Sequence, residues 1–438
     1  MRIAVVGSGI AGMGAAYALS EDFDVRLFER DARFGGHSNT IEVETAAGPI
    51  PVDTGFIVYN ERNYPNLCGL FDHLGVPTKL SDMSFGFSLQ GGRMEWSGDG
   101  LDTVFAQRRN ALRPGFLRGV LEILRFNRRG RESLAEGSAA GIGLGAWLER
   151  ERFSRWLRDC YVLPMGGAIW STPIGRMLDF PAENFLAFWA NHDLLSGLAD
   201  RQPWRTVAGG SREYVRRLLA RLGPRASAGA EVVAVTRPGG RPHLRFVDGS
   251  QAPFDAVVLA CHGPQARALL ADADAQERAA LAAFRTSANR AILHADPALM
   301  PRRRKVWSSW NFLSGGPEAD RARPAPVTYW MNRLQGIDRA HPLFVSLNPD
   351  RAPDPARVHA ELAYDHPVMD AEAFAGQRAL AAVQGRGGVW YAGAWLGYGF
   401  HEDGLRAGLA VAAALGARPA WARALPEPAA GAAAEAAE

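Results

Sequence analysis

The chain has 438 residues, of which 47% are hydrophobic and 22% charged, and its formal net charge is +3. This length and apolar content predict a globular protein of two to three domains. The near balance of charges gives no reason to expect a nucleic-acid partner.

Location and redox state can also be predicted. No apolar run approaches the roughly 20 residues that a membrane-spanning helix requires, and the first predicted strand begins at Arg2, which leaves no room for a signal peptide. We therefore expect a cytoplasmic protein. Cys68, Cys160 and Cys261 are far apart and include no C-x-x-C pair, so we expect reduced thiols and no metal site.

The chain opens with the pattern of a strand, a tight turn and a helix. Residues 2–6 are mostly apolar and run directly into Gly7-x-Gly9-x-x-Gly12. In this pattern Gly7 permits the turn, Gly9 lets a pyrophosphate approach the backbone, and Gly12 lets the helix pack against the strand. The next predicted strand ends at Glu29, where a carboxylate would meet a ribose hydroxyl. The sequence therefore predicts a dinucleotide site.

The strand pattern returns only after long interruptions. Buried or alternating strands are predicted at residues 230–236, 243–247 and 254–260, and a last strand at 388–393 precedes a helix at 401–415. We therefore expect a discontinuous nucleotide-binding domain and an inserted substrate domain. The nucleotide-binding domain would comprise residues 1–76, 205–285 and 386–425, and the substrate domain residues 77–204 and 286–385. The Ala/Pro/Glu-rich tail, residues 426–438, is expected to be disordered.

The two insertions are rich in aromatic and arginine residues. The aromatic side chains between residues 147 and 189 suit an apolar cavity, or they fill a core. Arginine is concentrated in residues 108–131, and a basic run at residues 302–305 is followed at once by Trp307 and Trp310.

One arginine-rich stretch has a helical pattern. In residues 116–129, four apolar side chains share one side and three arginines another. They are Leu117, Val120, Leu121 and Leu124, and Arg118, Arg125 and Arg129. The pattern is typical of an ordinary amphipathic helix and also of a helix lying on an anionic membrane. Because a second basic segment exists at residues 302–310, we expect contact with the inner membrane surface through both segments.

Four motifs together resemble the FAD-dependent amine oxidase and phytoene desaturase superfamily over nearly the whole chain. They are Gly7–Gly12 with Glu29, the loop Arg33-Phe-Gly-Gly36, the strand 254–261, and Ala392-Gly393 followed by His401-Glu-Asp-Gly-Leu405. The resemblance implies an α/β fold: a Rossmann-like FAD-binding domain of the amine oxidase and glutathione-reductase type, with an inserted α+β substrate domain. It also implies that the last helix directs its N-terminus at the flavin pyrimidine, where the helix dipole stabilises negative charge on reduced flavin.

Other segments are similar to one bacterial branch. Residues 35–40, 52–60, 293–294 and 307–311 resemble the flavoproteins that accompany cyclopropane-fatty-acid synthases and the flavin-dependent desaturases of methylated acyl chains in furan fatty acid formation. Two departures from a plain amine oxidase stand out. Ala394 replaces the usual acidic residue after Ala392-Gly393, and no cysteine lies near residues 393–404, so we expect no cysteinyl flavin link.

The resemblance implies a set of FAD contacts. We expect them from Gly7, Ser8, Gly9, Ile10, Ala11, Gly12, Glu29, Arg30, Gly35, Gly36, His37, Ser38, Gly55, Phe56, Val233, Ala260, Gly393, Glu402 and Asp403. Our candidates for proton handling or for orienting flavin and substrate are His37, His401, Tyr59 and Asn60, although each can also serve only local hydrogen bonding. Lys305 could hold a water near flavin N5, but its three preceding arginines favour a basic surface patch.

The expected chemistry is transfer of a hydride from substrate carbon to flavin N5. For an acyl chain the site should be long, apolar and dry, whereas an amine needs an aromatic pair or acidic groups that hold a cation. The aromatic insertions favour dehydrogenation of a lipid acyl chain, methylated or monounsaturated. Three alternatives stay open: an amine or polyamine oxidase, a redox-neutral isomerase that moves a double bond, and a flavin-bound lipid-binding protein without turnover.

Overall fold

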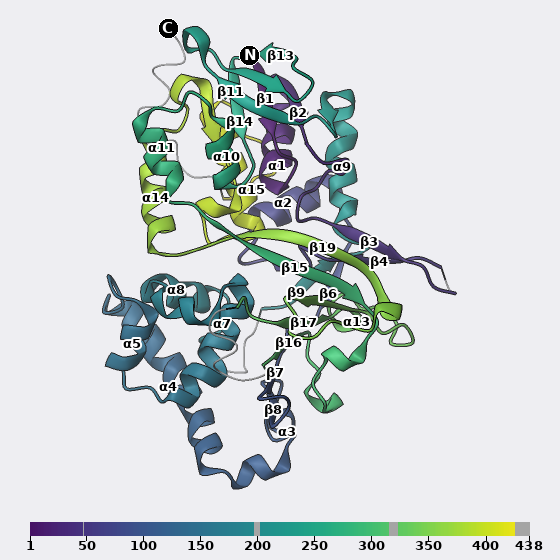
Figure 1. The fold of residues 1–438 in the computed structure, drawn as a ribbon, viewed down its shortest axis with the longest axis vertical. Helices are drawn as coiled ribbons and strands as arrows, with labels where there is room; N and C mark the ends of the chain where they lie inside the picture. Colours follow the sequence, from purple (N-terminus) through teal and green to yellow (C-terminus); the bar gives the residue numbers. More distant parts are fainter. Residues whose placement is uncertain (47, 197–201, 315–322, 425–438) are drawn as a thin grey trace.

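The computed structural model describes residues 1–46, 48–196, 202–314 and 323–424. A parallel sheet flanked by helices forms one end of the molecule, and a larger sheet and a group of helices form the other (Figure 1). The predicted tail, residues 426–438, lies outside the described residues. Within the described ranges, no helix combines the length and apolar character that crossing a bilayer requires.

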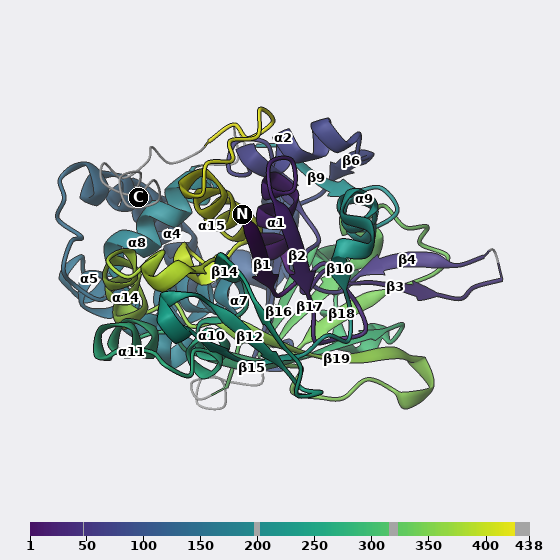
Figure 2. The ribbon, with the colours of Figure 1, turned by 90° about the horizontal axis from the view of Figure 1, so that it is seen from above.

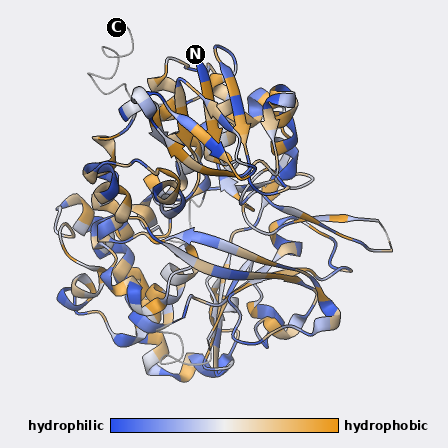
Figure 3. Ribbon diagram, turned by 45° about the horizontal axis from the view of Figure 1, so that its top comes forward, coloured by the Kyte–Doolittle hydropathy of each residue, from blue (hydrophilic) through white to orange (hydrophobic). Residues whose placement is uncertain are grey.

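The parallel sheet draws its strands from distant parts of the chain. Its order is β10-β2-β1-β14-β20, and every neighbouring pair is parallel. The bounds are β1 (Arg2–Val6), β2 (Asp24–Phe28), β10 (Ala226–Ser227), β14 (Ala256–Leu259) and β20 (Val389–Tyr391). Most residues of β1 and all of β14 are buried, which explains why these strands are nearly continuous apolar runs (Figure 3). The strands predicted at the start, middle and end of the chain therefore meet in one sheet.

Helices cover both faces of this sheet. They are α1 (Ile10–Leu19), α9 (Arg212–Leu222), α10 (Gly263–Leu269), α11 (Ala275–Ala282), α14 (Ala371–Ala381) and α15 (His401–Ala414). Every residue of α1 is buried. A Cβ atom on Gly12 would lie 1.9 Å from the Gly7 carbonyl oxygen, and one on Gly408 would lie 2.2 Å from the carbonyl oxygen of Ala11. Glycine at these positions is therefore what lets α1 pack against its own loop and against α15.

Three smaller sheets surround the parallel sheet. The antiparallel sheet β11-β12-β13 comprises β11 (Val232–Thr236), β12 (His243–Phe246) and β13 (Gln251–Pro253). The ribbon of β3 (Thr40–Val43) and β4 (Ile50–Asp53) projects from one side (Figure 2). A third sheet joins β5 (Tyr59–Asn60), β9 (Trp204–Val207) and β6 (Thr78–Ser81), and helix α2 (Pro65–Leu74) lies between β5 and β6 in the chain. This third sheet joins strands from both sides of the domain boundaries that we expected near residues 76 and 204.

The largest sheet belongs to the insertions. Its order is β19-β15-β18-β17-β16-β7-β8. The bounds are β7 (Phe85–Leu89), β8 (Met94–Ser97), β15 (Thr286–His294), β16 (Trp310–Leu313), β17 (Val327–Trp330), β18 (Phe344–Leu347) and β19 (Val358–Pro367), with the short helix α13 (Met331–Leu334). The parallel pairing of β7 with β16 brings the two insertions into one body.

The helices of the first insertion pack beside this sheet. They are α3 (Leu101–Val104), α4 (Pro114–Ala135), α5 (Leu144–Arg150), α6 (Arg155–Leu157), α7 (Leu163–Trp170) and α8 (Ala182–Asn191). Phe126, Trp147, Phe185 and Trp189 are among the largest fully buried side chains. Part of the aromatic content of the insertions therefore fills a core, which was one of the two interpretations of that pattern.

Candidate active site

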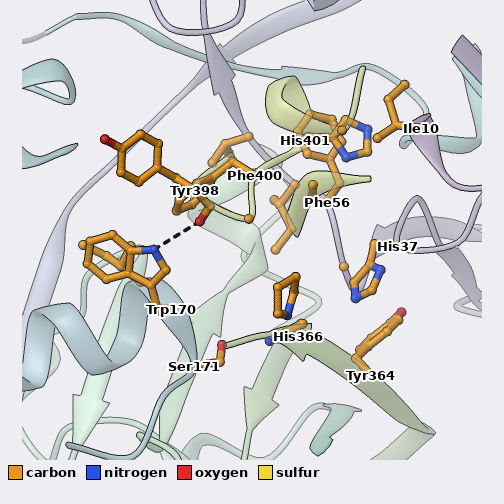
Figure 4. Close-up of a pocket in the computed structure, with 18 of the residues that line it drawn as sticks. Ile10, His37, Phe56, Trp170, Ser171, Tyr364, His366, Tyr398, Phe400 and His401 are labelled. Carbon is orange, nitrogen blue, oxygen red and sulfur yellow. Dashed lines mark hydrogen bonds between the residues drawn. The ribbon is translucent and has the colours of Figure 1, made fainter. Parts of the chain in front are cut away.

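A large cavity connects the parallel sheet with the inserted elements, and Figure 4 shows the part of it around His37 and His401. It has a volume of about 920 Å³, and its wall runs from the glycine loop after β1, past the N-terminus of α15, to helix α4. This position matches the rule that ligands of open α/β sheets bind beyond the carboxyl ends of the strands. No cluster of His, Cys, Asp or Glu that could hold a metal ion occurs among the described residues.

The glycine loop presents bare backbone to the cavity. Gly9 is the N-cap of α1 and makes no side-chain cap, so the first N–H groups of this ten-residue helix have no capping side chain. A Cβ atom on Gly9 would meet nothing within 4 Å, whereas one on Gly7, whose φ is +103°, would lie 2.7 Å from the carbonyl oxygen of Ala260. The loop is therefore closely packed against Ala260 at Gly7 and open at the Cβ position of Gly9, so a pyrophosphate can approach the backbone of Gly9.

Glu29 fixes the next part of the wall. One carboxylate oxygen accepts hydrogen bonds from the backbone N–H and the hydroxyl of Ser8, at 2.9 and 2.6 Å, and the other accepts from Asp31 N–H at 3.0 Å. Arg30 lies on the same wall. Glu29 therefore links the end of β2 to the glycine loop. Its carboxylate lies where it could accept a hydrogen bond from a ribose hydroxyl.

Two further loops meet at the cavity wall. Gly36 and His37 lie on the wall, as do Gly55 and Phe56. The Phe56 N–H donates to the His37 carbonyl oxygen at 2.8 Å, and a Cβ atom on Gly55 would lie 2.1 Å from that oxygen. The loop after Phe34 and the turn after β4 therefore form one unit that depends on glycine.

His401 opens helix α15 and is deeply engaged in the structure. Its imidazole lies flat on the Phe56 ring, with centroids 3.8 Å apart and planes at 9°, and its Nε2 lies 2.7 Å from the Tyr214 hydroxyl. Burial lowers the pKa of His401 to about 3, so the ring is neutral at pH 7. Gly393, Ala394 and His401 lie on the cavity wall, so the N-terminal end of α15 faces the cavity.

Three more rings surround His37. The ring centroids of His262, His366 and Tyr364 lie 5.8, 5.4 and 5.0 Å from that of His37. Burial lowers the pKa of His37 well below its usual range and that of His366 to about 4. The Nε2 atom of His37 has no hydrogen-bond partner among the described residues. This cluster therefore presents neutral imidazoles, one of which can bond a group held in the cavity.

Beyond the flavin motifs the wall becomes apolar. Phe400 stacks on Phe188 with centroids 4.7 Å apart, and Trp170 donates its indole N–H to the carbonyl oxygen of Tyr398 at 3.2 Å (Figure 4). Further along, α4 contributes Val120, Ile123, Leu124 and Asn127, and the large sheet contributes Phe85, Phe87, Trp310 and Tyr329. In this part of the wall Asp193 is ion-paired with Arg62 at 3.0 Å and Asp99 with Arg333 at 3.1 Å.

Most of the predicted cofactor residues come together at this cavity. Those on its wall are Gly7, Ser8, Gly9, Ile10, Ala11, Glu29, Arg30, Gly36, His37, Gly55, Phe56, Ala260 and Gly393. His401, a candidate for proton handling, lies on the wall as well. Gly12, Gly35 and Ser38 stand behind them: Gly12 packs on Gly7, the Gly35 N–H donates to the Ser8 hydroxyl at 3.1 Å, and the Ser38 hydroxyl is hydrogen-bonded to Tyr214.

The resemblance implied a cofactor contact at Val233, and the structure places its neighbour Val232 on the cavity wall instead. The pairing of β11 with β12 shifts its register between Val232 and Ala234, which is a bulge. A bulge changes which side chains of a strand share a face.

Glu402 and Asp403 are directed away from the cavity. The Glu402 carboxylate accepts the N–H groups of Asn66 and Leu67, each at 3.0 Å, and so caps the start of α2. Asp403 accepts the N–H groups of Tyr398 and Phe400, both at 3.0 Å, and caps its own helix. Neither residue lies on the wall. Their acidic side chains satisfy backbone N–H groups at helix N-termini.

Tyr59 and Asn60 also lie off the cavity wall. Their exposed fractions are 3% and 1%, and the Asn60 side-chain oxygen accepts the N–H of Asn63 at 2.8 Å. They occupy β5, whose pairing with β9 turns them into the body of the protein. Lys305 likewise lies off the wall and forms an ion pair with Asp102.

Sequence reasoning missed four residues of the site. His262 follows β14 directly, so its place at the carboxyl end of a predicted strand was a usable signal. Tyr364 and His366 lie near the end of β19, and Tyr214 lies on α9. No motif marks these three, because only the tertiary fold brings them to the glycine loops.

The fold and the site define a flavin-dependent oxidoreductase. Residues 10–354 match the family of flavin containing amine oxidoreductases, and the chain belongs to this family. Its cofactor is FAD. A carotenoid phi-ring synthase from Streptomyces griseus is 31% identical over 174 residues, which are 34% of this chain and 31% of that protein.

Solved structures share the fold at low identity. A CLA-producing fatty acid isomerase from P. acnes is 17% identical with a TM-score of 0.66, over 93% of this chain and 96% of that one. Putrescine oxidase bound to putrescine is 15% identical with a TM-score of 0.69, over 95% and 99%. Cyclohexylamine oxidase from Brevibacterium oxydans is 17% identical with a TM-score of 0.68, over 94% and 98%.

Proposed function

We propose that the protein dehydrogenates an acyl chain of a lipid, a methylated or monounsaturated fatty acyl group of a phospholipid. The observation that carries this proposal is the wall beyond His401, where aromatic and aliphatic side chains from the insertions continue as far as α4. An apolar chain gains free energy by leaving water for such a wall, whereas a cation loses hydration there.

The residues present fit FAD. The open face of Gly9 and the uncapped start of α1 suit the pyrophosphate, and Glu29 suits the ribose. When bound, FAD supplies a hydride acceptor at N5. The N-terminal end of α15, which opens at His401, faces the cavity, and Glu402 and Asp403 lie in its first turn.

The protein itself orients the chain and receives the proton. Desaturation would break two C–H bonds: bound FAD would take one hydrogen with its electron pair, and the other would leave as a proton. His37, whose imidazole is neutral and has an unpartnered Nε2, is our candidate proton acceptor. The apolar wall would keep water away from the reacting carbons.

Two carboxylates of the wall are engaged by the protein itself, because Asp99 and Asp193 are paired with arginines. Asp365 and the aromatic pair of Phe188 and Phe400 also line the wall, and these are groups of the kind that can hold an amine cation. The likeness to putrescine oxidase and to the fatty acid isomerase extends to the fold. Both an amine oxidase and an isomerase are therefore kept as outcomes of the test.

The test is anaerobic mixing of the FAD-loaded protein with detergent-solubilised phospholipids that carry methylated or monounsaturated chains, and separately with a panel of amines. We expect the oxidised flavin band to bleach with the lipids only. Bleaching with amines only would overturn the proposal. Conversion of the lipid to an isomer of equal mass without flavin reduction would replace desaturation by isomerisation.

A matched pair of variants on α4 links the result to the cavity. Ile123→Trp adds bulk to a residue on the wall, whereas Leu121→Trp adds the same bulk to a side chain that is 66% exposed and lies off the wall. We expect I123W to slow flavin reduction by long chains more than by short ones, and L121W to leave both rates near the original values.

A further inference from the structure

The fold brings the two basic segments of the sequence together. Arg109, in the short helix Arg108–Leu112, and Arg302 and Arg303, just before the short helix Arg304–Val306, line one surface hollow with Gly92 and Arg93. The hollow has a volume of about 370 Å³. Arg109 also donates to the carbonyl oxygen of Arg93 at 2.9 Å. Residues that are nearly 200 positions apart in the chain therefore form one cationic site.

In the part of the chain that the structure describes, the charge of this hollow is neutralised from within the protein only at Arg303. Glu95 stands behind it, fully buried, and accepts the N–H of Arg302 at 2.7 Å and the side chain of Arg303 at 2.7 Å. No ion pair of Arg93, Arg109 or Arg302 occurs among the described residues. Three guanidinium groups are therefore available to an anion from outside.

Exposed leucines cluster on the same part of the molecule. Eight large apolar side chains of the described residues are strongly exposed, and five of them lie between residues 101 and 124. They are Leu101 (76%), Leu112 (85%), Leu117 (38%), Leu121 (66%) and Leu124 (61%). These residues belong to α3, the turn after it and the first half of α4, in the lower part of Figure 1. On an ordinary protein surface, exposed apolar side chains are scattered singly, so this cluster of exposed leucines needs an explanation.

The orientation of α4 is fixed by its other face. Phe116 and Gly119 are buried, and a Cβ atom on Gly119 would lie 2.1 Å from the Trp156 ring. Arg129 is paired with Glu151 at 2.9 Å. Arg125, which donates to the Glu151 carbonyl oxygen and lies over the Phe153 ring, faces the protein in the same way. Arg125 and Arg129 therefore hold α4 in place, and the cationic site comes from the hollow instead.

Leu124 connects this surface with the cavity. It is 61% exposed and at the same time lies on the cavity wall, next to Val120 and Ile123. The apolar stripe of α4 therefore continues from the outer surface into the site. A hydrocarbon chain that enters past Leu124 stays in contact with apolar side chains along this route.

We propose that this leucine surface, residues Leu101, Leu112, Leu117, Leu121 and Leu124, docks on an anionic lipid bilayer, with the hollow of Arg93, Arg109 and Arg302 binding phosphate-bearing headgroups. The leucines enter the interface, and the adjacent guanidinium groups neutralise the headgroups. The entry of an acyl chain past Leu124 rests on the proposed function. The docking on a bilayer is independent of that function. A second copy of the chain fits this surface less well, because a twofold contact would bring the two cationic hollows toward each other.

The test is flotation of the FAD-loaded protein with vesicles of phosphatidylglycerol and phosphatidylethanolamine, compared with phosphatidylcholine vesicles. We expect binding to the anionic vesicles only, weakened by salt. The triple variant R93Q/R109Q/R302Q should lower the partition coefficient about 100-fold, the product of a factor of about five for each cation. The double variant L112Q/L121Q should lower it at least about tenfold through lost apolar burial.

Matched controls lie elsewhere on the surface. Leu80, 68% exposed on β6, gives the control L80Q, and the exposed Arg245 and Arg267 of the nucleotide-binding end give R245Q/R267Q. Equal binding by all variants, or no binding by the original protein, would overturn the docking. A dimer in light scattering that L112Q/L121Q converts to monomer, without vesicle binding, would show a protein interface instead. Flavin reduction by detergent-solubilised lipid is measured separately, so failure of docking and failure of the proposed function can be distinguished.

Discussion

The imidazole of His401 and the ring of Phe56 lie face to face, 3.8 Å apart, although 345 residues separate them in the chain. Phe56 ends the turn that follows β4, and His401 begins α15. Tyr214 holds the Nε2 atom of the same imidazole at 2.7 Å. The contact between Phe56 and His401 therefore joins the turn after β4 to α15, the helix whose N-terminal end faces the cavity.

Substituting His401 by leucine should weaken this connection between the turn and α15. His401→Leu removes the stacked pair and the bond to Tyr214, which together contribute about 2 kcal/mol. We expect a lower free energy of unfolding and also less retained FAD, read from the flavin-to-protein absorbance ratio after gel filtration. His73→Leu is the matched control, because His73 stacks on Trp421 and bonds to Tyr17 away from the cavity. H73L should lose stability but keep its FAD, and equal FAD loss in both variants would contradict the connecting role of His401.

Glu402 should matter for folding and not for the flavin. Its carboxylate caps the start of α2 through the N–H groups of Asn66 and Leu67. Glu402→Ala leaves these donors unpaired, which should lower the free energy of unfolding by about 1–3 kcal/mol. Denaturant unfolding measures this change, and the visible spectrum of the bound flavin should stay as it was. A shifted flavin spectrum with unchanged stability would instead indicate a direct cofactor contact.

His37 should affect the chemical step. Because burial holds the pKa of His37 well below its usual range, its imidazole is neutral near pH 7 and has a lone pair that can accept a proton. His37→Ala should slow anaerobic flavin reduction by about 100-fold or more if the ring accepts the proton. The rate of the original protein should fall on the acid side only well below the ordinary pKa of histidine. A variant with normal flavin reduction would remove His37 from proton transfer.

His294 should contribute to acid sensitivity of folding. It is fully buried in β15, with Nε2 2.8 Å from the Ser346 hydroxyl and Nδ1 accepting the Asp296 N–H, and burial lowers its pKa to about 4. A lowered pKa means that the unfolded chain binds the proton first. The stabilisation is therefore complete above pH 6.5 and is lost as the pH falls toward 4.

The matching experiment compares unfolding curves at several pH values. Between pH 6.5 and 4, His294→Gln should reduce the slope of unfolding free energy by up to about 1.4 kcal/mol per pH unit, the value for one proton. Other buried imidazoles, among them His192 and His366, still contribute to the slope. An unchanged slope in H294Q would show that His294 is not a source of it.

The sequence predicts local parts of the site better than assembled ones. Gly7, Gly9 and Gly12 are predictable because a turn, a close ligand approach and a close helix contact each require glycine at that spacing. The strands at residues 254–260 and 388–393 are predictable because buried parallel strands are continuous apolar runs. The amphipathic pattern of residues 116–129 likewise predicted α4.

The rest depends on tertiary structure. The resemblance implied a contact at Val233, whereas Val232, beside a bulge in β11, lies on the cavity wall. Glu402 was assigned to the flavin from the same resemblance, and the sequence does not show that α2 begins beside it. His366 and the joined hollow of Arg109 and Arg302 exist only because strands distant in the chain pair in the large sheet.

The most direct test of the account is a single anaerobic turnover with one equivalent of phospholipid, followed by the mass of the recovered acyl chain. Our account predicts that each flavin reduced corresponds to one acyl chain that has lost two hydrogen atoms. An acyl chain of unchanged mass with oxidised flavin, or reduction by amines alone, would contradict it.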